Sequence, residues 1–179
     1  MTPTVPIRVD VPVLETERLI FGAPGIEHLE DEVAFFASER SAGVGGPLPR
    51  DQVFRSLAGI IGHWVIRGYG FWAITEKSSG RYCGRVGCWF PEGWPEREIG
   101  WSLMEHAEGR GLAAEAAIAS RKFAYDHMGW QTAISLVLPG NTRSIALAER
   151  LGCTLDDDYE HPKHGVVLIF RHPPPEAVR

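Results

Sequence analysis

Two glycines that flank an arginine, Gly109-Arg110-Gly111, follow an apolar stretch and precede a long alanine-rich one, Leu112 to His127. This order predicts a strand, a tight turn and a helix. The backbone N–H groups of such a turn point outward without partners at the positive end of the helix dipole. Gly111 has no side chain to block an approaching anion. The turn therefore predicts a ligand that carries a diphosphate.

Other interpretations of the turn compete with this one. A P-loop requires G-x-x-x-x-G-K-[ST], which the chain lacks. A dinucleotide-binding crossover fits Gly109-x-Gly111-x-x-Ala114, but it needs an acidic residue at the end of the next strand, and none lies between His127 and Ala148. A tight turn without any ligand explains an isolated G-x-G equally well. The surrounding sequence has to decide among them.

Composition limits the class of protein. The chain has 179 residues, 44% of them hydrophobic, which suits one domain, 1–179, with a real core. A net charge of −5 lacks the basic character of nucleic-acid binders. The longest mostly apolar run, Leu57–Ile66, is far short of the about 20 residues that span a membrane. The three cysteines share no metal-ligand spacing and favour a reducing compartment. We expect a cytoplasmic protein without nucleic-acid, membrane or metal partners.

Hydrophobic periodicity and turn residues predict the elements. Residues 1–13 are expected to be a loose lead-in and 173–179 a disordered tail. The expected strands are 18–21, 70–76, 81–90, 98–104, 132–138, 153–155 and 165–171, with a polar loop between the last two. The expected helices are 26–36, one capped by Asp51 and ended by Gly68, 112–127, and one capped by Asn141 and ended by Gly152. A Gly/Pro loop is expected at 41–50.

The order of strand, turn, alanine-rich helix, strand and Asn-x-x-Ser helix resembles the GNAT superfamily of acetyl-CoA-dependent N-acetyltransferases. It looks most like the branch that contains the ribosomal-protein N-terminal acetyltransferases. The similar stretches are Leu14–Phe21, Gly84–Gly87, Trp94–Trp101, Glu108–Ala116, Asn141–Ser144 and Arg150–Gly152. The resemblance implies an α/β (α+β) fold with a mixed, mostly antiparallel sheet of about seven strands and helices on both faces.

The resemblance also implies a cofactor site for acetyl-CoA as co-substrate. The pantetheine arm would lie between the strands 98–104 and 132–138, and the pyrophosphate would rest on backbone N–H groups of the turn, with Arg110 adding charge at the rim. The implied cofactor-binding residues are Leu103, Glu108, Gly109, Arg110, Gly111, Leu112, Ala113, Ala114, Asn141 and Ser144. The backbone N–H near Leu103 would meet the oxyanion. Glu108 departs from the Gln or Arg usual at its position, and a carboxylate beside phosphates is unfavourable unless it points away.

The implied chemistry needs a neutral amine, which at neutral pH is scarce for a lysine-like amine of pKa about 10.4. A carboxylate helps by acting as base directly or through water. By resemblance, Glu98 is the expected base. The alternative is that Glu98 only hydrogen-bonds a neighbouring strand. Ala148 stands where many relatives carry the tyrosine that protonates the thiolate, so Ser144 becomes the expected thiol partner. Asn141 is expected to contact the thioester arm, to cap its helix, or both.

The expected function is acetyl transfer from acetyl-CoA to a primary amine by direct attack in a ternary complex. A protein N-terminus, a polyamine-like or aminoglycoside-like amine and an amino-acid derivative stay open as acceptors, and a homodimer is left open. A non-catalytic acyl-CoA-binding module on the same fold and a dinucleotide enzyme are the alternatives. His161 and His164 are expected to be solvated rather than metal ligands. Trp89, Phe90 and Trp94 are expected in either an acceptor pocket or the core.

Overall fold

The computed structural model describes residues 9–178 of the chain. The strands are β1 (Leu14–Glu15), β2 (Leu19–Gly22), β3 (Phe71–Glu76), β4 (Tyr82–Trp89), β5 (Glu98–Leu103), β6 (Ile134–Val137), β7 (Thr154–His161) and β8 (Gly165–Arg171). The α-helices are α1 (Leu29–Ala37), α2 (Arg50–Arg67), α3 (Leu112–Met128) and α4 (Thr142–Arg150). Short 3-10 helices are η1 (Ile26–His28), η2 (Glu39–Val44), η3 (Glu105–Ala107) and η4 (Pro175–Ala177). No helix within the described range is long and apolar enough to cross a bilayer.

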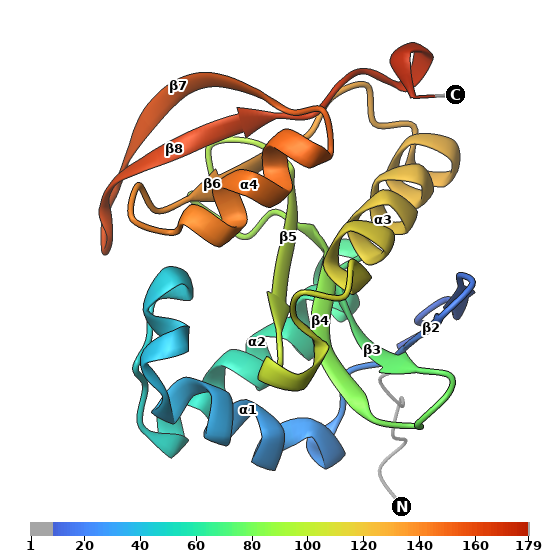
Figure 1. The fold of residues 1–179 in the computed structure, drawn as a ribbon, viewed down its shortest axis with the longest axis vertical. Coiled ribbons are helices and arrows are strands. Elements are labelled where there is room, and N and C mark those ends of the chain that lie inside the picture. The colour runs from blue at the N-terminus through green and yellow to red at the C-terminus, as the bar shows by residue number, and fades with distance from the viewer. Residues whose placement is uncertain (1–8, 179) are drawn as a thin grey trace, which may run out of the picture.

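One mixed sheet organises these elements (Figure 1), with strand order β1-β2-β3-β4-β5-β6-β8-β7. Neighbouring strands run antiparallel except β5 and β6, which are parallel. The connection from β5 to β6 contains α3, as a parallel crossover requires. The mixed, mostly antiparallel sheet is confirmed, and in the described residues it has eight strands rather than about seven because the two-residue strand β1, which was not expected, pairs with β2 at the edge.

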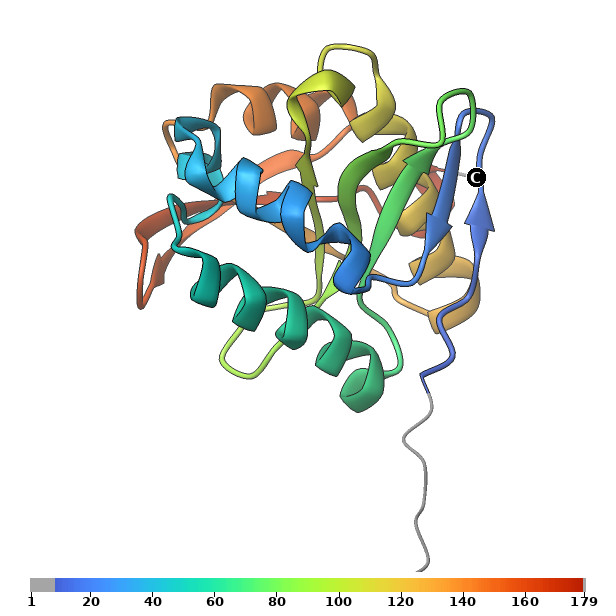
Figure 2. The same cartoon turned by 90° about the horizontal axis from the view of Figure 1, so that it is seen from below.

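Helices cover both faces of the sheet, as expected (Figure 2). One core cluster joins α3 and α4 to side chains of β3, β4 and β5 such as Trp72, Val86 and Ile99. A second cluster lies between α1 and α2 and includes Tyr82 and Met104 at the ends of the neighbouring strands. Along β5, odd-numbered side chains therefore face α3 and α4, whereas even-numbered ones face α1 and α2. Glu98 and Trp101 consequently lie on opposite faces.

The alanine-rich helix packs closely on the sheet, as its composition predicts. Ala116, Ala117 and Ala124 of α3 are fully buried against the first core cluster. Alanine has the best helix propensity, and its small side chain lets the helix axis approach the strands. The close packing holds the first turn of α3 directly beyond the end of β5, where the Gly109–Gly111 turn connects the two.

Four local expectations are corrected. Helix α2 begins at Arg50 with Pro49 as its N-cap, so Asp51 does not cap it. Strand β7 extends to His161, because pairing with β8 draws the acidic stretch expected as a loop into an edge hairpin. Part of the expected loop 41–50 is the 3-10 helix η2. Residues 175–177 form η4 with Pro175 buried, so the described part of the tail is ordered.

Other boundaries agree with the sequence. Gly68 ends α2 in the left-handed conformation at φ 75°. Asn141 caps α4 through its side chain, which accepts a hydrogen bond from Ser144 N. Of the expected lead-in, residues 9–13 carry no regular structure and residues 1–8 lie outside the described range.

Candidate active site

The parallel strands β5 and β6 separate after one step of regular pairing. Ile134 N donates to Arg97 O over 2.9 Å, and Glu98–Ile134 is their single register pair. A continued parallel ladder would direct Leu136 N to Ile99 O. Instead, Leu136 N donates to the Glu98 carboxylate over 3.2 Å, and Ile99 O accepts from the Ser135 hydroxyl at 2.6 Å. Two side chains thus satisfy the backbone groups that the separation would leave unpaired.

Beyond this point the inner edge of β5 is open. Met104 N donates to Cys83 O of β4, so the alternate residues Trp101 and Leu103 direct their peptide groups away from β4, toward the gap. Backbone donors and acceptors at an unpaired edge accept an extended ligand as an additional strand. Leu103 therefore lies where the sequence puts it, with its N–H toward the gap.

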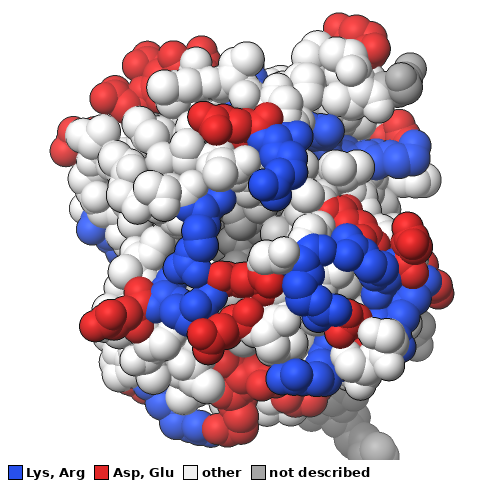
Figure 3. Space-filling model, in the orientation of Figure 1, with Lys and Arg blue, Asp and Glu red and all other residues white. Residues whose placement is uncertain are grey.

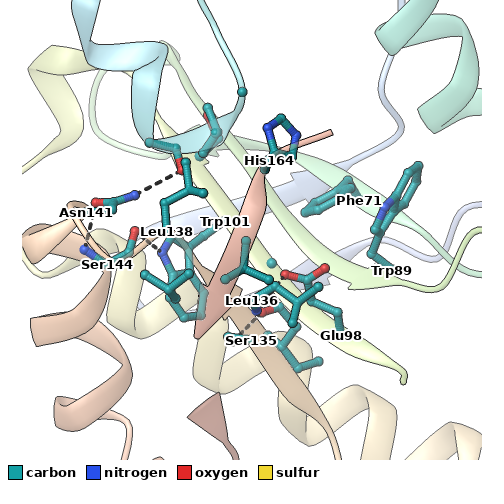
Figure 4. A pocket seen from close by; sticks show the side chains of 18 of the residues that line it. Phe71, Trp89, Glu98, Trp101, Ser135, Leu136, Leu138, Asn141, Ser144 and His164 are labelled. Atoms are coloured by element: carbon teal, nitrogen blue, oxygen red, sulfur yellow. Dashed lines mark hydrogen bonds between the residues drawn. The ribbon is translucent and has the colours of Figure 1, made fainter. Parts of the chain in front are cut away.

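Glu98 is a buried acid, 7% exposed, that faces a cavity. Burial raises its pKa to about 7, although hydrogen bonds from Trp94 Nε1 (2.6 Å) and Leu136 N favour the charged form. Figure 4 shows its carboxylate pointing into the space beside Leu136 and the Phe71–Trp89 pair. A carboxyl group with a pKa near 7 is suited to accept a proton at neutral pH.

The turn after β5 has the geometry that its glycines predict. Gly109 and Gly111 are left-handed, at φ 70° and φ 77°. Among the described residues, no group accepts a hydrogen bond from the backbone N–H of Gly109, Arg110 or Gly111. Leu112 begins α3, so its first-turn N–H groups join them. The expected anion-binding turn is thus built from backbone donors.

Contrary to expectation, Arg110 does not add charge to the cavity. Its guanidinium forms an ion pair with Glu76 on β3 and does not line the cavity beside the turn. This ion pair with Glu76 holds the Arg110 side chain on the β3 side of the turn, away from the cavity. The Arg18 guanidinium also binds the Arg110 carbonyl over 2.8 Å, which fixes the turn from outside.

Arginines that the sequence analysis missed occupy the place given to Arg110. Arg40 of η2 and Arg143 of α4 both form ion pairs with Glu108, the latter at 2.6 Å. Both line the cavity with Arg150. Figure 3 shows basic and acidic side chains close together around the hollowed centre of this face. The two guanidinium groups thereby balance the charge of the Glu108 carboxylate, which lies within the site rather than pointing away from it.

Ser144 and Asn141 lie on the α4 side of the gap (Figure 4). The Ser144 hydroxyl accepts a hydrogen bond from Trp101 Nε1 over 3.2 Å. No group among the described residues accepts the proton of this hydroxyl, so the proton is free to be donated to a ligand. The Asn141 amide caps α4 and donates from Nδ2 to Gly43 O over 3.2 Å. Asn141 thus ties η2 to α4, and Ala148, fully buried, offers no polar atom here.

Two adjoining cavities meet at this gap. One cavity, of about 360 Å³, is lined by the turn, the start of α3 and α4, including Leu103, Glu108, Gly109, Gly111, Leu112, Ala113, Ala114, Asn141 and Ser144. We call it the cofactor cavity after the ligand expected there. The other, of about 310 Å³, contains Glu98 with aromatic side chains around it. We call it the acceptor cavity after the amine expected there. Both cavities are lined by Trp101, Ser102, Asn141 and Ser144. A reacting group at the shared boundary would have Ser144 on one side and the Glu98 cavity on the other.

The aromatic residues and histidines divide differently from expectation. Trp89 and Trp94 line the acceptor cavity, whereas Phe90 does not and instead lies against the Arg67 guanidinium. His161 is buried, 8% exposed, so the expectation of a solvated side chain is wrong for this residue. His164 is exposed, as expected, and its ring stacks on that of His161 at 4.6 Å. Within the described residues, no group of three or more potential ligands is placed to hold a metal ion.

A buried polar chain supports the gap from β8. His172 Nε2 contacts the Ser135 hydroxyl at 2.9 Å, and its Nδ1 lies 3.3 Å from Arg121. Since Ser135 donates to Ile99 O, it accepts from His172 Nε2–H, and Nδ1 accepts from Arg121. Desolvation lowers the His172 pKa to about 3, so the ring stays neutral. These hydrogen bonds join residues of three separate elements, so no residue spacing in the sequence predicts them.

Comparison with known proteins agrees with this geometry. A model of the acetyltransferase (GNAT) domain matches residues 18–154. The chain belongs to the GNAT acetyltransferase family. An acetyltransferase structure from Agrobacterium tumefaciens is 34% identical, covering 96% of this chain and 99% of that one with a TM-score of 0.84.

Two further comparisons are informative for this GNAT chain. RimL, a ribosomal L7/L12 alpha-N-protein acetyltransferase solved with coenzyme A, shares the fold with a TM-score of 0.73 at 16% identity, covering 90% of this chain and 97% of that one. The uncharacterized protein YkkB of Bacillus subtilis is 32% identical over 91 residues, 48% of this chain. That match spans about half, 52%, of YkkB.

Proposed function

We propose that this GNAT chain transfers the acetyl group of acetyl-CoA to a primary amine by direct attack in a ternary complex. The observation that carries the proposal is the position of Glu98, a buried carboxyl group with a pKa of about 7 in a cavity that adjoins an open backbone turn. The family membership supports acetyl-CoA as co-substrate. The three cysteines are free, which suits a reducing compartment, and we place its action in the cytoplasm.

Acetyl-CoA would be held by backbone groups and arginines. The pyrophosphate fits the free N–H groups of residues 109–113, which carry the positive end of the α3 dipole. Arg40, Arg143 and Arg150 supply charge from the cavity wall. The pantetheine amides fit the unpaired edge of β5 at Trp101 and Leu103, whose N–H groups are candidates for the oxyanion contact.

The chemistry then follows from the two sides of the gap. The amine loses a proton to the Glu98 carboxylate, directly or through water, and its lone pair attacks the thioester carbonyl. This attack forms the N–C bond. When the tetrahedral intermediate collapses, the C–S bond breaks and the nitrogen releases its second proton to solvent, to which Glu98 also returns the proton it accepted. The Ser144 hydroxyl donates its proton to the departing sulfur and regains one from solvent. The products are the acetylated amine and free CoA thiol.

The first test measures thermal unfolding with acetyl-CoA, CoA and NAD in parallel. Ligand at about 100 Kd stabilises the native state by roughly 2.7 kcal/mol. We expect both CoA species to raise Tm and NAD to leave it unchanged. An increase with NAD alone would instead support a dinucleotide enzyme, and no shift with millimolar CoA would refute the proposal.

The second test measures CoA thiol release with an amine panel. We expect Glu98→Gln to lower kcat/KM by about 10²- to 10⁴-fold and to remove the rise of activity with pH through about 7. Retained acetyl-CoA binding, checked by Tm, separates lost chemistry from lost folding. An unchanged pH profile would show that another group is the base. CoA binding without transfer to any amine would favour the non-catalytic module.

A further inference from the structure

The acceptor cavity is walled by aromatic rings on two sides of Glu98. Phe71 and Trp89 form one wall, with ring centroids 5.2 Å apart. Trp94, His161 and His164 form the other, with centroid distances of 5.2 Å and 4.6 Å. All five side chains line the cavity. Two aromatic walls are more than the proposed transfer step itself requires.

The walls are held in place by contacts from behind. His63 stacks on Trp89 at 4.3 Å and accepts a hydrogen bond from Phe90 N over 3.1 Å. The Phe71 ring occupies space that a side chain at position 100 would fill, because a Cβ on Gly100 would lie 2.7 Å from it. Trp94 is fixed by its bond to Glu98. A rigid apolar surface of this kind binds a flat hydrophobic group without much loss of conformational entropy.

Charge in the cavity is limited to one accessible acid. Among the described residues that line it, Glu98 is the single carboxylate. Arg85 also lines it, but its guanidinium forms an ion pair with the buried Glu32 at 3.0 Å and lies over the Phe36 ring. A polyamine or an aminoglycoside carries several ammonium groups, and each would need its own partner on losing water. The described residues that line the cavity offer a carboxylate partner to one ammonium group.

The segment around η2 also borders the cavity. Gly43, Val44 and Gly45 line it, and the Gly43 carbonyl is fixed by Asn141. His164 packs against Gly45 from the β7–β8 hairpin, since a Cβ there would lie 2.8 Å from its ring. A volume of about 310 Å³ lies at the lower end of the range for small-molecule sites, and it fits a small molecule better than the extended end of a protein chain.

We infer that the acceptor is a small monoamine whose primary amine is carried on an apolar, preferably aromatic, body. The inference rests on the proposed function and specifies its acceptor. The ammonium group approaches along the aromatic faces, where ring quadrupoles attract it, and reaches the Glu98 carboxylate, which takes its proton. The body of the molecule stays between the Phe71–Trp89 and Trp94–His161–His164 walls.

The test compares amines at saturating acetyl-CoA through thiol release. The panel contains 2-phenylethylamine, n-propylamine, spermidine, kanamycin and a tetrapeptide that begins with serine. We expect kcat/KM for 2-phenylethylamine to exceed that of each other amine by at least about tenfold, the effect of one good aromatic contact. Equal or better activity with spermidine, kanamycin or the peptide would overturn the inference while leaving the proposed function intact.

A binding measurement makes the inference independent of catalysis. Calorimetric titration of 2-phenylethylamine into CoA-saturated protein should give a Kd that rises about tenfold in Trp89→Leu, with n-propylamine affected less than about twofold. Phe71→Leu provides a second variant should Trp89→Leu fold poorly. Phe54→Ala, at a half-exposed ring of α2 outside the cavity, is the matched control. Equal weakening of both amines, or of neither, would contradict the aromatic site. Binding without thiol release would uphold the acceptor class and refute the proposed reaction.

Discussion

Leu136 N donates its hydrogen bond to Glu98 Oε1 over 3.2 Å, in the place where a continued parallel ladder would offer it Ile99 O. The proposed base is therefore also part of the structure that separates β5 from β6. Its carboxylate compensates a lost backbone hydrogen bond, so the opening of the sheet and the position of the base are one feature. Because of this double role, ionisation of Glu98 should change both the free energy of unfolding and the reaction rate.

Stability should depend on pH through Glu98. A glutamate in the unfolded chain titrates near 4.3, whereas the folded pKa is about 7, so between these values the folded state binds more protons. The free energy of unfolding should fall as pH rises through this window, by at most about 4 kcal/mol, and level off above it. Urea unfolding from pH 4.5 to 8 would show this fall in the wild type and a flatter profile in Glu98→Gln.

The wild-type profile also contains an opposing contribution from His172, whose lowered pKa reduces stability as pH falls below about 6.5. The difference between wild type and Glu98→Gln isolates the glutamate. Glu92→Gln, at a fully exposed glutamate, should reproduce the wild-type profile. Parallel profiles for wild type and Glu98→Gln would mean that the buried carboxyl does not titrate in this window.

Two buried serines of neighbouring strands should respond oppositely to alanine. Ser135→Ala removes the donor to Ile99 O and the acceptor of His172, and we expect a loss of about 1–3 kcal/mol in unfolding free energy. Ser102→Ala is the matched control, because the Ser102 hydroxyl is buried without a partner among the described residues. Its substitution should be neutral or stabilising. Equal effects in urea titrations would show that the Ser135 bonds contribute nothing specific.

The Ser144 hydroxyl should matter in the chemical step. Ser144 lines both cavities, and its hydroxyl proton has no acceptor among the described residues. Ser144→Ala should therefore lower kcat by about 10²-fold and leave KM for acetyl-CoA nearly unchanged. Ser144→Thr retains a hydroxyl and should recover much of the rate. If the threonine variant is as slow as the alanine variant, the loss comes from disturbed packing against Trp101 rather than from proton donation.

Affinity for acetyl-CoA should depend on arginines outside the glycine turn. Arg143→Ala removes a cation that lines the cofactor cavity and should raise Kd about tenfold, with an effect that shrinks at high salt. Arg110→Ala is the matched control, since that guanidinium pairs with Glu76 outside the cavity. Titrations at low and high ionic strength would check both. A larger loss for Arg110→Ala would restore the role first expected of it.

Substitution of Glu108 should change the affinity for acetyl-CoA in the opposite direction. Its carboxylate holds Arg40 and Arg143, so Glu108→Gln should free both for phosphate and lower Kd for acetyl-CoA by a few fold. The same titration compares it with Glu105→Gln, whose carboxylate is 80% exposed and contacts Arg40 alone. Weaker binding by Glu108→Gln would mean that the acid positions the arginines productively.

The amino-acid sequence by itself determined the order of elements and the left-handed turn whose backbone N–H groups are open. Periodicity marked α3 and its alanine face, and glycines at 109 and 111 required the left-handed turn that exposes backbone donors. These are local properties, because helix propensity and backbone φ depend on neighbours along the chain. The motif order was enough to place Glu98, Asn141 and Ser144 beside one gap.

Tertiary structure decided which charges and rings face that gap. Arg110 turned toward Glu76, while Arg40 and Arg143 met at Glu108 from segments about a hundred residues apart in sequence. The Ser135–His172 pair and the stack of His161 on His164 likewise depend on strand register across β6, β7 and β8. Side-chain direction and desolvation follow from packing among distant elements, and no local spacing encodes them.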